Sequence, residues 1–560
     1  MELIIITAII FFSVFLNSLN FIVGLLSTPK DLFFLGTVHW SGDYFYYLSQ
    51  FAQGKISWLK GYDLYTADFP VETYVGWVNV FLGRIFYLLG VSHLLAYQLS
   101  VVIFSITFLG VSYLVIREIF SKRGKRIVAF LLFTISNAFP IITVQGGSFS
   151  FSYYDYWFNM GIPFNRLICV PHQLIARTCV VLAILLAIWW WKKRRKLILP
   201  GLLLVGFILA SVEPVQWGLV VGVLFIASII IIIYGSCHKS VPTFASKSPA
   251  CGGVKASEAS VGIPSFVSPA AKLNVFNIAG LFLLLGGLPM ALYLKDIFSR
   301  PPYLQLALWE ATQQVRINLA TFILGNGPVL VLAIIGIFFF IRKITFARLV
   351  ALIFSLVSVF LFFSPIPGMV KIINVRFLPA ATTLFFACFA AEAIFALSQR
   401  FKKRSSLIIY TIVGLVVLIV LPAYISQSKT RLTVDITNAF YYVPIKTIEA
   451  YKKAEKVSTP SDTFLVTWPF NSSFPGMTGR RVFHGHNLLT IDYEKKDGQA
   501  IEFFAGRMKK EEQRNFLLQN KINYVLAYSW EGEVKSSANL IPVFDNSWLA
   551  LYRVKRPEDR

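Results

Sequence analysis

The chain has 560 residues and a formal net charge of +24, and 56% of its residues are hydrophobic while only 14% are charged. Soluble domains average about 25% charged residues, so a soluble chain of this length would be short of charged surface. A basic chain also suits nucleic acid, but here the basic residues stand in short clusters between apolar runs, as the positive-inside rule distributes them. The composition therefore predicts a polytopic membrane protein and no nucleic-acid partner.

Long apolar runs predict eleven membrane spans, because a stretch of about 20 apolar residues crosses the hydrocarbon core of a bilayer. The first run follows Glu2 and lacks both a basic leading region and a small-residue cleavage site, so we interpret it as an uncleaved span and not as a signal peptide. The expected fold class is thus a polytopic α-helical membrane protein. The predicted spans are 3–27, 94–116, 127–144, 174–191, 198–212, 215–234, 275–294, 319–341, 349–363, 378–398 and 407–426.

Lys and Arg are concentrated in alternate loops, and this asymmetry predicts the orientation in the plasma membrane. If the basic loops are cytoplasmic, the N-terminus is cytoplasmic and the residues after 426 are extracytoplasmic. The segment Val75–Val91 is apolar, but as a span it would reverse the bias at every later loop. We therefore expect it to be a helix in the outer interface, with Arg84 reaching toward the headgroups. The basic loops are 117–126, 192–196, 239–272, 342–348 and 400–404.

The chain is expected to divide into a transmembrane domain, 1–426, and an extracytoplasmic soluble α/β domain, 427–560. The first contains a long outer loop, 28–93, and a Ser- and Pro-rich cytoplasmic stretch, 237–273, which reads as a flexible linker. The second is long enough for one small domain. Its predicted elements are a helix at 436–456, a strand at 463–467, a helix at 499–518, a strand at 522–528 and a hairpin of 540–544 with 548–554.

The first outer loop holds the most informative residues. Asp43 lies shortly after the first span, within an aromatic cluster, where a carboxylate is costly unless it is paired or used. Several carboxylates close together suit acid/base work on a hydroxyl group or the binding of a cation. An aromatic belt with solvated acids is the alternative reading. The further candidates for substrate binding in this loop are Tyr44, Tyr47, Asp63, Asp68 and Glu72.

Other polar residues outside the spans extend the list of candidates. Asp155, Arg166 and His172 are expected to line an acceptor groove, although a His at a helix start is commonly a cap or a core residue. Glu213 is expected at the tip of a helical hairpin, the alternative being that it faces a cavity. Glu392 lies inside a span, where pairing with a neighbouring helix is the simplest explanation. In the tail, Arg480, His484 and His486 either form a polar rim over the substrates or fix the tail against the membrane part.

Motifs of soluble enzymes are missing from the sequence: it has no Walker loop, dinucleotide-binding turn, metalloprotease helix or Gly-x-Ser-x-Gly elbow. Cys237, His238 and Cys251 form the one Cys/His cluster, and its spacing does not favour a metal site. An ATP-driven pump is accordingly not expected from this chain alone.

Four features give the chain a family resemblance. They are the acidic residue Asp43 after the first span, the Tyr and Gly that follow it, the order of spans and loops, and the stretch 475–486. It resembles the GT-C superfamily of integral membrane glycosyltransferases, in particular the protein mannosyltransferase/aminoarabinose transferase-like branch. The resemblance implies transfer of a hexosyl or pentosyl group from a polyprenyl-phosphate-linked donor to a lipid, glycan or protein acceptor on the extracytoplasmic face.

The resemblance also implies residue roles. Asp43 matches the catalytic carboxylate and would act as general base. Arg376, with Lys371 beside it, would bind the leaving lipid phosphate, the alternative being an ordinary interfacial anchor. Asp155 could join Asp43 in holding a divalent metal, but the acidic pair of the oligosaccharyltransferase branch is not apparent, so no metal ligand is assigned.

Two other classes of function stay open at this point. A transporter or lipid-handling protein is expected to have ionisable residues at mid-span and internal symmetry. A non-catalytic membrane scaffold would use the tail to bind a partner. Replacing Asp43 by Asn distinguishes the enzyme from these two classes, because only the enzyme hypothesis predicts a folded protein without turnover.

Overall fold

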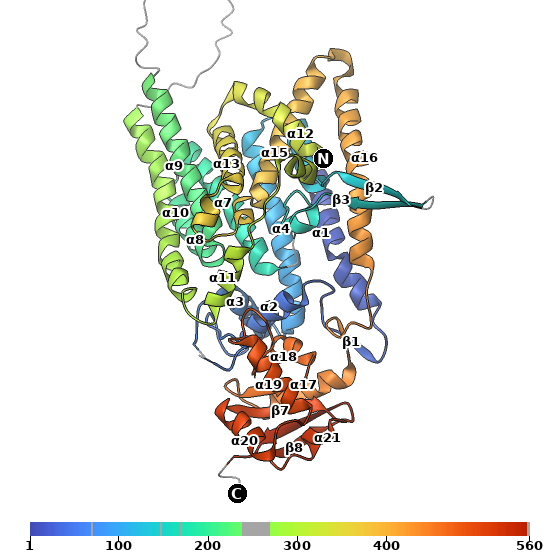
Figure 1. Cartoon of the computed structure of the whole chain (residues 1–560). Helices are drawn as coiled ribbons and strands as arrows, with labels where there is room; N and C mark the ends of the chain where they lie inside the picture. The colour runs from blue at the N-terminus through green and yellow to red at the C-terminus, as the bar shows by residue number, and fades with distance from the viewer. Residues whose placement is uncertain (69–70, 146–147, 168–169, 238–268, 557–560) are drawn as a thin grey trace, which may run out of the picture.

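The computed structural model describes residues 1–68, 71–145, 148–167, 170–237 and 269–556 (Figure 1). Within these ranges, nine helices are long and apolar enough to cross a membrane, and they run side by side as one bundle. The protein is therefore a multi-pass membrane protein. The nine helices are α1 (Glu2–Leu26), α4 (His93–Ile119), α7 (Pro171–Lys193), α9 (Pro214–Cys237), α10 (Pro269–Ile297), α12 (Leu319–Phe340), α13 (Phe346–Phe363), α15 (Ala380–Gln399) and α16 (Ser405–Leu432).

Two shorter helices, α5 (Arg123–Ile135) and α8 (Ile198–Val212), occupy the positions of the remaining predicted spans. The prediction of a span over 127–144 is wrong in its second half. The helix ends at Ile135, and the chain then forms an antiparallel hairpin of β2 (Pro140–Gln145) and β3 (Ser148–Tyr153). Pro140 lacks the N–H that a helix needs, and the β-branched residues after it favour a strand.

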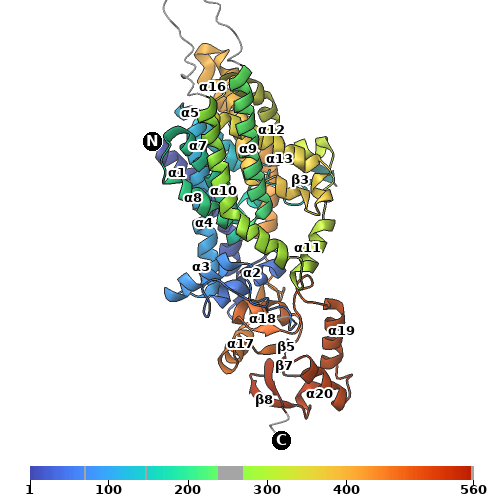
Figure 2. The ribbon, with the colours of Figure 1, turned by 90° about the vertical axis from the view of Figure 1, so that its left-hand side faces the viewer.

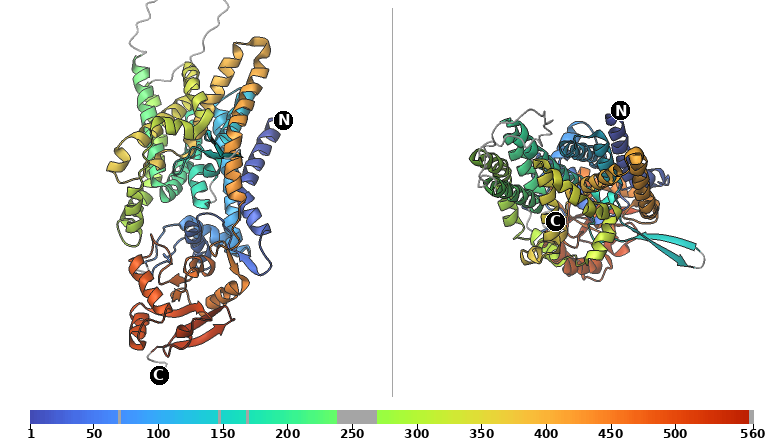
Figure 3. Two further views of the ribbon diagram at one scale, coloured as in Figure 1. Left: turned by 45° about the vertical axis from the view of Figure 1, so that its right-hand side comes forward. Right: turned by 90° about the horizontal axis from the view of Figure 1, so that it is seen from above.

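The β2–β3 hairpin projects sideways from the bundle, beside α16 (Figure 3). Alternate residues along it are apolar and exposed, as in the pairs Ile142 with Phe151 and Val144 with Phe149. The predicted linker 237–273 falls for the most part on 238–268, outside the described residues. Its last residues are helical, because α10 begins at Pro269.

Short helices complete the bundle and its connections. The segments between the long helices contain α6 (Pro163–Arg166), α11 (Tyr303–Thr312), η1 (Ile341–Lys343), α14 (Ile366–Met369), η2 (Asn374–Phe377) and η3 (Lys402–Arg404).

The first loop, 28–93, folds as β1 (Leu32–Phe34), α2 (Ser41–Gln53) and α3 (Trp77–Leu88). As predicted, the apolar segment at 75–91 is a helix too short to cross a bilayer. Arg84 differs from the expectation: it donates to the Lys55 carbonyl oxygen at 2.9 Å and lies over the Trp58 ring, so its contacts are within the protein.

The helices α2 and α3 cross with their backbones in contact at Gly54 and Gly83. A Cβ atom at Gly83 would overlap the Phe51 carbonyl oxygen, and one at Gly54 would overlap the α3 backbone. Glycine is needed at this crossing because no side chain fits between the two helices.

The tail is an α/β domain built on a five-stranded sheet of order β6-β5-β7-β9-β8. The strands β6, β5 and β7 are parallel, and β9 and β8 are antiparallel. Its elements are β4 (Tyr442–Pro444), α17 (Ile445–Val457), β5 (Thr463–Val466), α18 (Phe470–Thr478), β6 (Arg481–Val482), α19 (Tyr493–Phe504), α20 (Lys510–Gln519), β7 (Ile522–Tyr528), α21 (Gly532–Lys535), β8 (Leu540–Asp545) and β9 (Leu549–Val554).

The predicted strands and hairpin of the tail are confirmed, and both predicted helices need correction. The helix expected at 436–456 begins only at Ile445, because the residues before it pair with β1. The helix expected at 499–518 is two helices, α19 and α20, separated at Gly506, which has a positive φ of 68°. A positive φ interrupts a right-handed helix, and glycine adopts it without strain.

The tail packs against the first loop at one end of the bundle (Figures 1 and 2). β1 pairs with β4, the Val482 N–H donates to the Leu64 carbonyl at 2.8 Å, and Lys496 forms an ion pair with Asp68. α18 packs along α2. The loop and the tail thus form one layer over what we call the tail-side end of the bundle.

Candidate functional site

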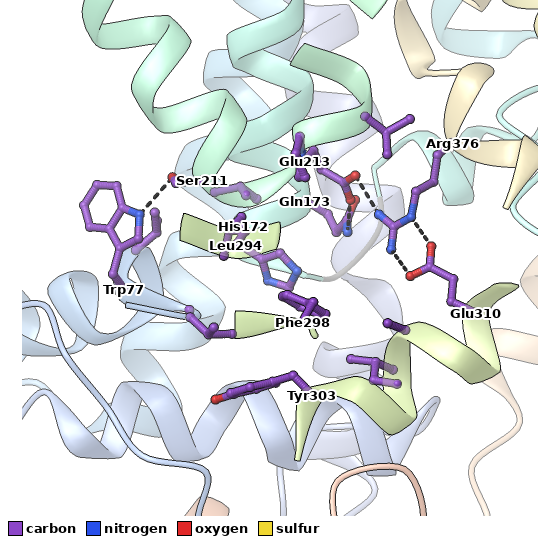
Figure 4. Close-up of a pocket in the computed structure, with 18 of the residues that line it drawn as sticks. Trp77, His172, Gln173, Ser211, Glu213, Leu294, Phe298, Tyr303, Glu310 and Arg376 are labelled. Atoms are coloured by element: carbon purple, nitrogen blue, oxygen red, sulfur yellow. Dashed lines mark hydrogen bonds and ion pairs between the residues drawn. The ribbon is translucent and has the colours of Figure 1, made fainter. Parts of the chain in front are cut away.

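A cavity of about 470 Å³ lies at the tail-side end of the bundle, between the long helices and the first loop (Figure 4). Its walls come from α2, the segment before α3, the start of α7, the turn between α8 and α9, the end of α10, α11 and the segment 371–376. Five other parts of the chain therefore meet the first loop here.

Arg376, on η2, is the centre of the polar wall. Its Nη1 donates to Glu213 Oε2 at 2.6 Å, while Nε and Nη2 donate to the two carboxylate oxygens of Glu310 on α11. Figure 4 shows the guanidinium between the two carboxylates. Burial opposes the charge, but the carboxylates outweigh it and raise the pKa of Arg376 above its ordinary value. Arg376 therefore carries a fixed positive charge.

The position of Arg376 is set by a neighbouring hydrogen-bond network. The Asn374 amide donates to the carbonyl oxygens of Val315 and Phe362 at 2.8 and 2.9 Å. Gln314 donates to the Ile372 carbonyl at 2.8 Å. These bonds tie the segment after α11 to the segment that carries Arg376.

Glu213 was expected at the tip of a helical hairpin, and it does follow α8 directly. Its side chain nevertheless is only 2% exposed, and it also accepts a hydrogen bond from Gln173 at 2.8 Å. The sequence reasoning missed Glu310 as a partner of Arg376 and Gln173 as a partner of Glu213. The available signal was that Glu213 and Glu310 both follow apolar runs on the same predicted side as Arg376.

One face of α2 forms the opposite wall of the cavity. Tyr46 and Tyr47 line it, and the Tyr47 ring lies 4.2 Å from the ring of His172, measured between centroids. His172 stands in the first turn of α7 and lines the cavity, as does Lys371. The structure thus brings Tyr47, His172 and Lys371 to one cavity.

Asp43 lies one helical turn before Tyr47 and does not line the cavity itself. The Asp43 side chain is exposed to solvent on one side. The protein around the rest of the carboxyl group buries it in part and so raises its pKa above the usual range. Burial also raises the pKa of the Tyr47 phenol, the Asp43 carboxylate raises it further, and the charge of Arg376 lowers it. The charges of Asp43 and Arg376 therefore both act on the Tyr47 hydroxyl group.

The tail brings His486 to the first turn of α2. Its Nε2 would lie 3.8 Å from a Cβ atom at Gly42, and its ring is 5.8 Å from that of Tyr65. Burial lowers the pKa of His486 to about 4, so it is neutral near pH 7. His484 lies deeper in the tail, with Nε2 3.3 Å from Asp497.

The other acidic candidates of the first loop have protein partners. Asp68 pairs with Lys496, and Glu72 lies 3.5 Å from Lys60. Asp63 is 7% exposed; its Oδ1 accepts the Tyr65 N–H at 2.9 Å, and burial raises its pKa to about 7. Asp63 does not line the cavity.

Several remaining candidates lie away from the cavity. Arg166 is 2% exposed and donates to four backbone carbonyls, those of Met160, Gly161, Thr134 and Ser136. These bonds hold the connection between α5 and α7.

Arg480 likewise donates within the tail, to Ser458 and to the Glu455 carbonyl. Tyr44 is buried against Tyr97, with ring centroids 4.9 Å apart. Asp155 is exposed and accepts the Tyr156 N–H.

The buried acid Glu392 is paired with neighbouring helices, as expected: Lys125 donates to it at 2.7 Å and Arg348 at 3.0 Å. Of the predicted Cys/His cluster, His238 and Cys251 lie outside the described residues. Within the described ranges, no group of three or more His, Cys, Asp or Glu side chains is arranged to hold a metal ion.

Neither the family models nor the curated proteins contain a match to this sequence. Among solved structures, the chain is similar to the apo oligosaccharyltransferase of Archaeoglobus fulgidus, with a TM-score of 0.50 and 12% identity over 99% of this chain and 75% of that one. It is also similar to arabinofuranosyltransferase AftD from mycobacteria, with a TM-score of 0.50 and 13% identity over 99% of this chain and 40% of that one.

At 12% and 13% identity, the likeness to these structures establishes a shared fold. The chain therefore has the fold of these two transferases, in agreement with the fold that the sequence resemblance implied.

Proposed function

We propose that the protein is a membrane glycosyltransferase that moves a sugar from a polyprenyl-phosphate-linked donor to a hydroxyl group of an acceptor. The cavity is the observation that supports this proposal. Arg376 lies in one wall, and α2, the helix that carries Asp43, forms the opposite wall. Sugar transfer from a lipid phosphate requires a cation that binds the phosphate and a general base for the acceptor hydroxyl.

Arg376 serves the donor side of the reaction. When the bond between the anomeric carbon and the phosphate oxygen breaks, the bonding electrons leave with the lipid phosphate, and negative charge develops on its oxygens. A guanidinium group stabilises that charge through paired N–H donors. Lys371 and Lys295 also line the cavity and add to its positive field.

Asp43 serves the acceptor side as general base. It takes the proton of the acceptor hydroxyl while the hydroxyl oxygen forms the new bond to the anomeric carbon. The raised pKa of Asp43 makes it a better base than an ordinary carboxylate. Tyr47 and His172, between Asp43 and Arg376, present aromatic surface to a sugar ring.

The orientation proposed for this reaction places the tail-side end of the bundle outside the plasma membrane. The basic loops within the described residues support it, because they belong to the opposite end and the positive-inside rule puts such loops in the cytoplasm. The acceptor, a lipid, glycan or protein, would then approach from the extracytoplasmic side.

The test is donor turnover in proteoliposomes. Wild type, Asp43→Asn, Asp43→Glu and the control Glu511→Gln, an exposed acid of the tail, receive a panel of polyprenyl-phosphate sugars and an acceptor mixture. We expect wild type and control to release free polyprenyl phosphate and Asp43→Asn to lose about 10²-fold or more in rate. Equal release by Asp43→Asn would reject Asp43 as the base. Transport of the intact donor, without cleavage, would reject the enzyme in favour of a lipid transporter.

A further inference from the structure

The two carboxylates on Arg376 are held in different ways. Glu213 accepts from Nη1 and from Gln173, and its side chain is 2% exposed. Glu310 accepts from Nε and Nη2, and its side chain is 21% exposed. Among the described residues, Arg376 is the one hydrogen-bond partner of the Glu310 carboxylate. Glu213 is a permanent counterion, whereas Glu310 can turn away by a change of its own side chain.

The donors that hold Glu310 are the ones a phosphate would use. Arginine binds carboxylates and phosphates alike through two parallel N–H groups, which match the spacing of two oxygens on one atom. Here this pair is Nε and Nη2, and both of its members are taken by Glu310. A phosphate that binds Arg376 in the same way must therefore replace Glu310.

The charges of the cavity favour such an exchange. Lys295, Lys371 and Arg376 bring three positive charges, and Glu213 and Glu310 bring two negative ones, so the lining sums to +1. With the Glu310 carboxylate turned away into solvent, the sum becomes +2. The released lipid phosphate is a monoester with a charge of about −1.5 to −2 at pH 7, while the donor is a diester with a single negative charge. The product phosphate would hence be held more tightly than the donor.

We propose that Glu310 and the lipid phosphate compete for the Nε and Nη2 donors of Arg376, and that Glu310 expels the product phosphate after transfer. This inference rests on the proposed function, since it assumes that a lipid phosphate binds in the cavity. Glu310 is then a residue that sets the affinity for phosphate and the rate of product release. It forms no bond to the sugar.

The experiment measures binding to the full-length protein in nanodiscs by calorimetry. The probes are farnesyl phosphate, farnesol and inorganic phosphate, and the variants are Glu310→Gln, Glu213→Gln and Arg376→Gln. We expect Glu310→Gln to bind farnesyl phosphate about tenfold more tightly than wild type, because the competing charge is gone. Glu213→Gln adds the same charge to the lining but leaves Nε and Nη2 occupied by Glu310, so its gain in affinity should be smaller than that of Glu310→Gln. An equal gain in both variants would assign the effect to net charge and reject the competition. Farnesol binding should be the same in every variant.

The probes also identify what the site recognises. Tighter binding of inorganic phosphate by Glu310→Gln would assign the competition to the phosphate alone, and tighter binding of farnesyl phosphate only would require the lipid chain as well. Both support the exchange. In turnover assays, Glu310→Gln should lower KM and also lower kcat, because product release slows. Thermal unfolding confirms that each variant is folded.

Two further results would overturn the inference. If Arg376→Gln loses binding while Glu310→Gln binds as wild type or more weakly, the donor site stands and the competition is wrong. If wild type and all variants bind none of the probes, both the competition and the proposed donor site are wrong.

Discussion

The ring of His172, in the first turn of α7, lies 4.2 Å from the ring of Tyr47 on α2, measured between centroids. This contact joins a membrane-spanning helix to the loop helix that carries Asp43. The Tyr47 phenol is in turn influenced by the charges of Asp43 and Arg376. The pair of rings is therefore the structural link between the two ends of the proposed reaction.

Replacing His172 tests whether this link works through packing. His172→Phe keeps a ring against Tyr47 and should retain most of the turnover, whereas His172→Ala should lose about tenfold, since an aromatic pair is worth about 0.5–1.5 kcal/mol beyond its buried area. Steady-state release of polyprenyl phosphate is the measurement. Equal loss in both variants would show that the imidazole nitrogens are needed and that packing alone does not explain the role of His172.

Replacing Arg376 by Lys tests the paired-donor geometry. A lysine keeps the positive charge but offers a point charge in place of a planar fork. We expect Arg376→Lys to raise KM for the lipid-linked donor about tenfold or more while the protein stays folded. Arg507→Lys, at an exposed position of the tail, is the matched control and should leave KM unchanged. An unchanged KM in Arg376→Lys would contradict a role for the fork in donor binding.

Asp63 predicts a pH dependence of stability. Its pKa is raised to about 7 by burial, whereas in the unfolded chain it is about 3.9. Between these values the folded state holds a proton that the unfolded state has lost, so Asp63 lowers stability progressively as pH rises from about 4 to about 7, by about 1.4 kcal/mol per pKa unit.

Asp63→Asn should remove this effect. Its Oδ1 can still accept the Tyr65 N–H that Asp63 accepts at 2.9 Å. The difference in Tm between Asp63→Asn and wild type should grow in favour of the variant from pH 4 to pH 7 and then level off. The difference cancels the titration of other groups, such as His486. A constant difference over this range would show that Asp63 does not titrate there.

The crossing of α2 and α3 predicts a strong effect of one methyl group. A Cβ at Gly83 would overlap the Phe51 carbonyl oxygen, so Gly83→Ala must push the helices apart, at a cost of about 1–3 kcal/mol. Gly498→Ala is the control, because a Cβ there meets nothing within 4 Å and alanine favours the helix α19. Thermal unfolding in detergent should show a lower Tm for Gly83→Ala only.

Local patterns predicted much of the fold. The apolar runs located the spans because a bilayer demands about 20 apolar residues whatever the rest of the chain does. The strands β5 and β7 and the hairpin β8–β9 were predicted from short buried runs between turn residues. The prediction of a single span over 127–144 was wrong in its second half, because a short apolar run is equally hydrophobic in a helix and in a strand. Pro140 favours the strand over the helix.

The tertiary structure alone decided how the tail meets the membrane part. The strand β1 pairs with β4, more than 400 residues further along. Each of these segments is too short to be predicted as a strand by itself, and each is a strand because the other supplies its hydrogen bonds.

The sequence by itself determined that the chain is a membrane protein with a small α/β tail, and it singled out Asp43 and Arg376. Which side chains meet Arg376 was decided only by the fold. Glu310 and Glu213 are 66 and 163 residues away from it in sequence. Polar residues in loops carry no periodicity, so their partners cannot be inferred before the helices are packed. Burial then selects the arrangement, because a charge removed from water must find its counter-charge.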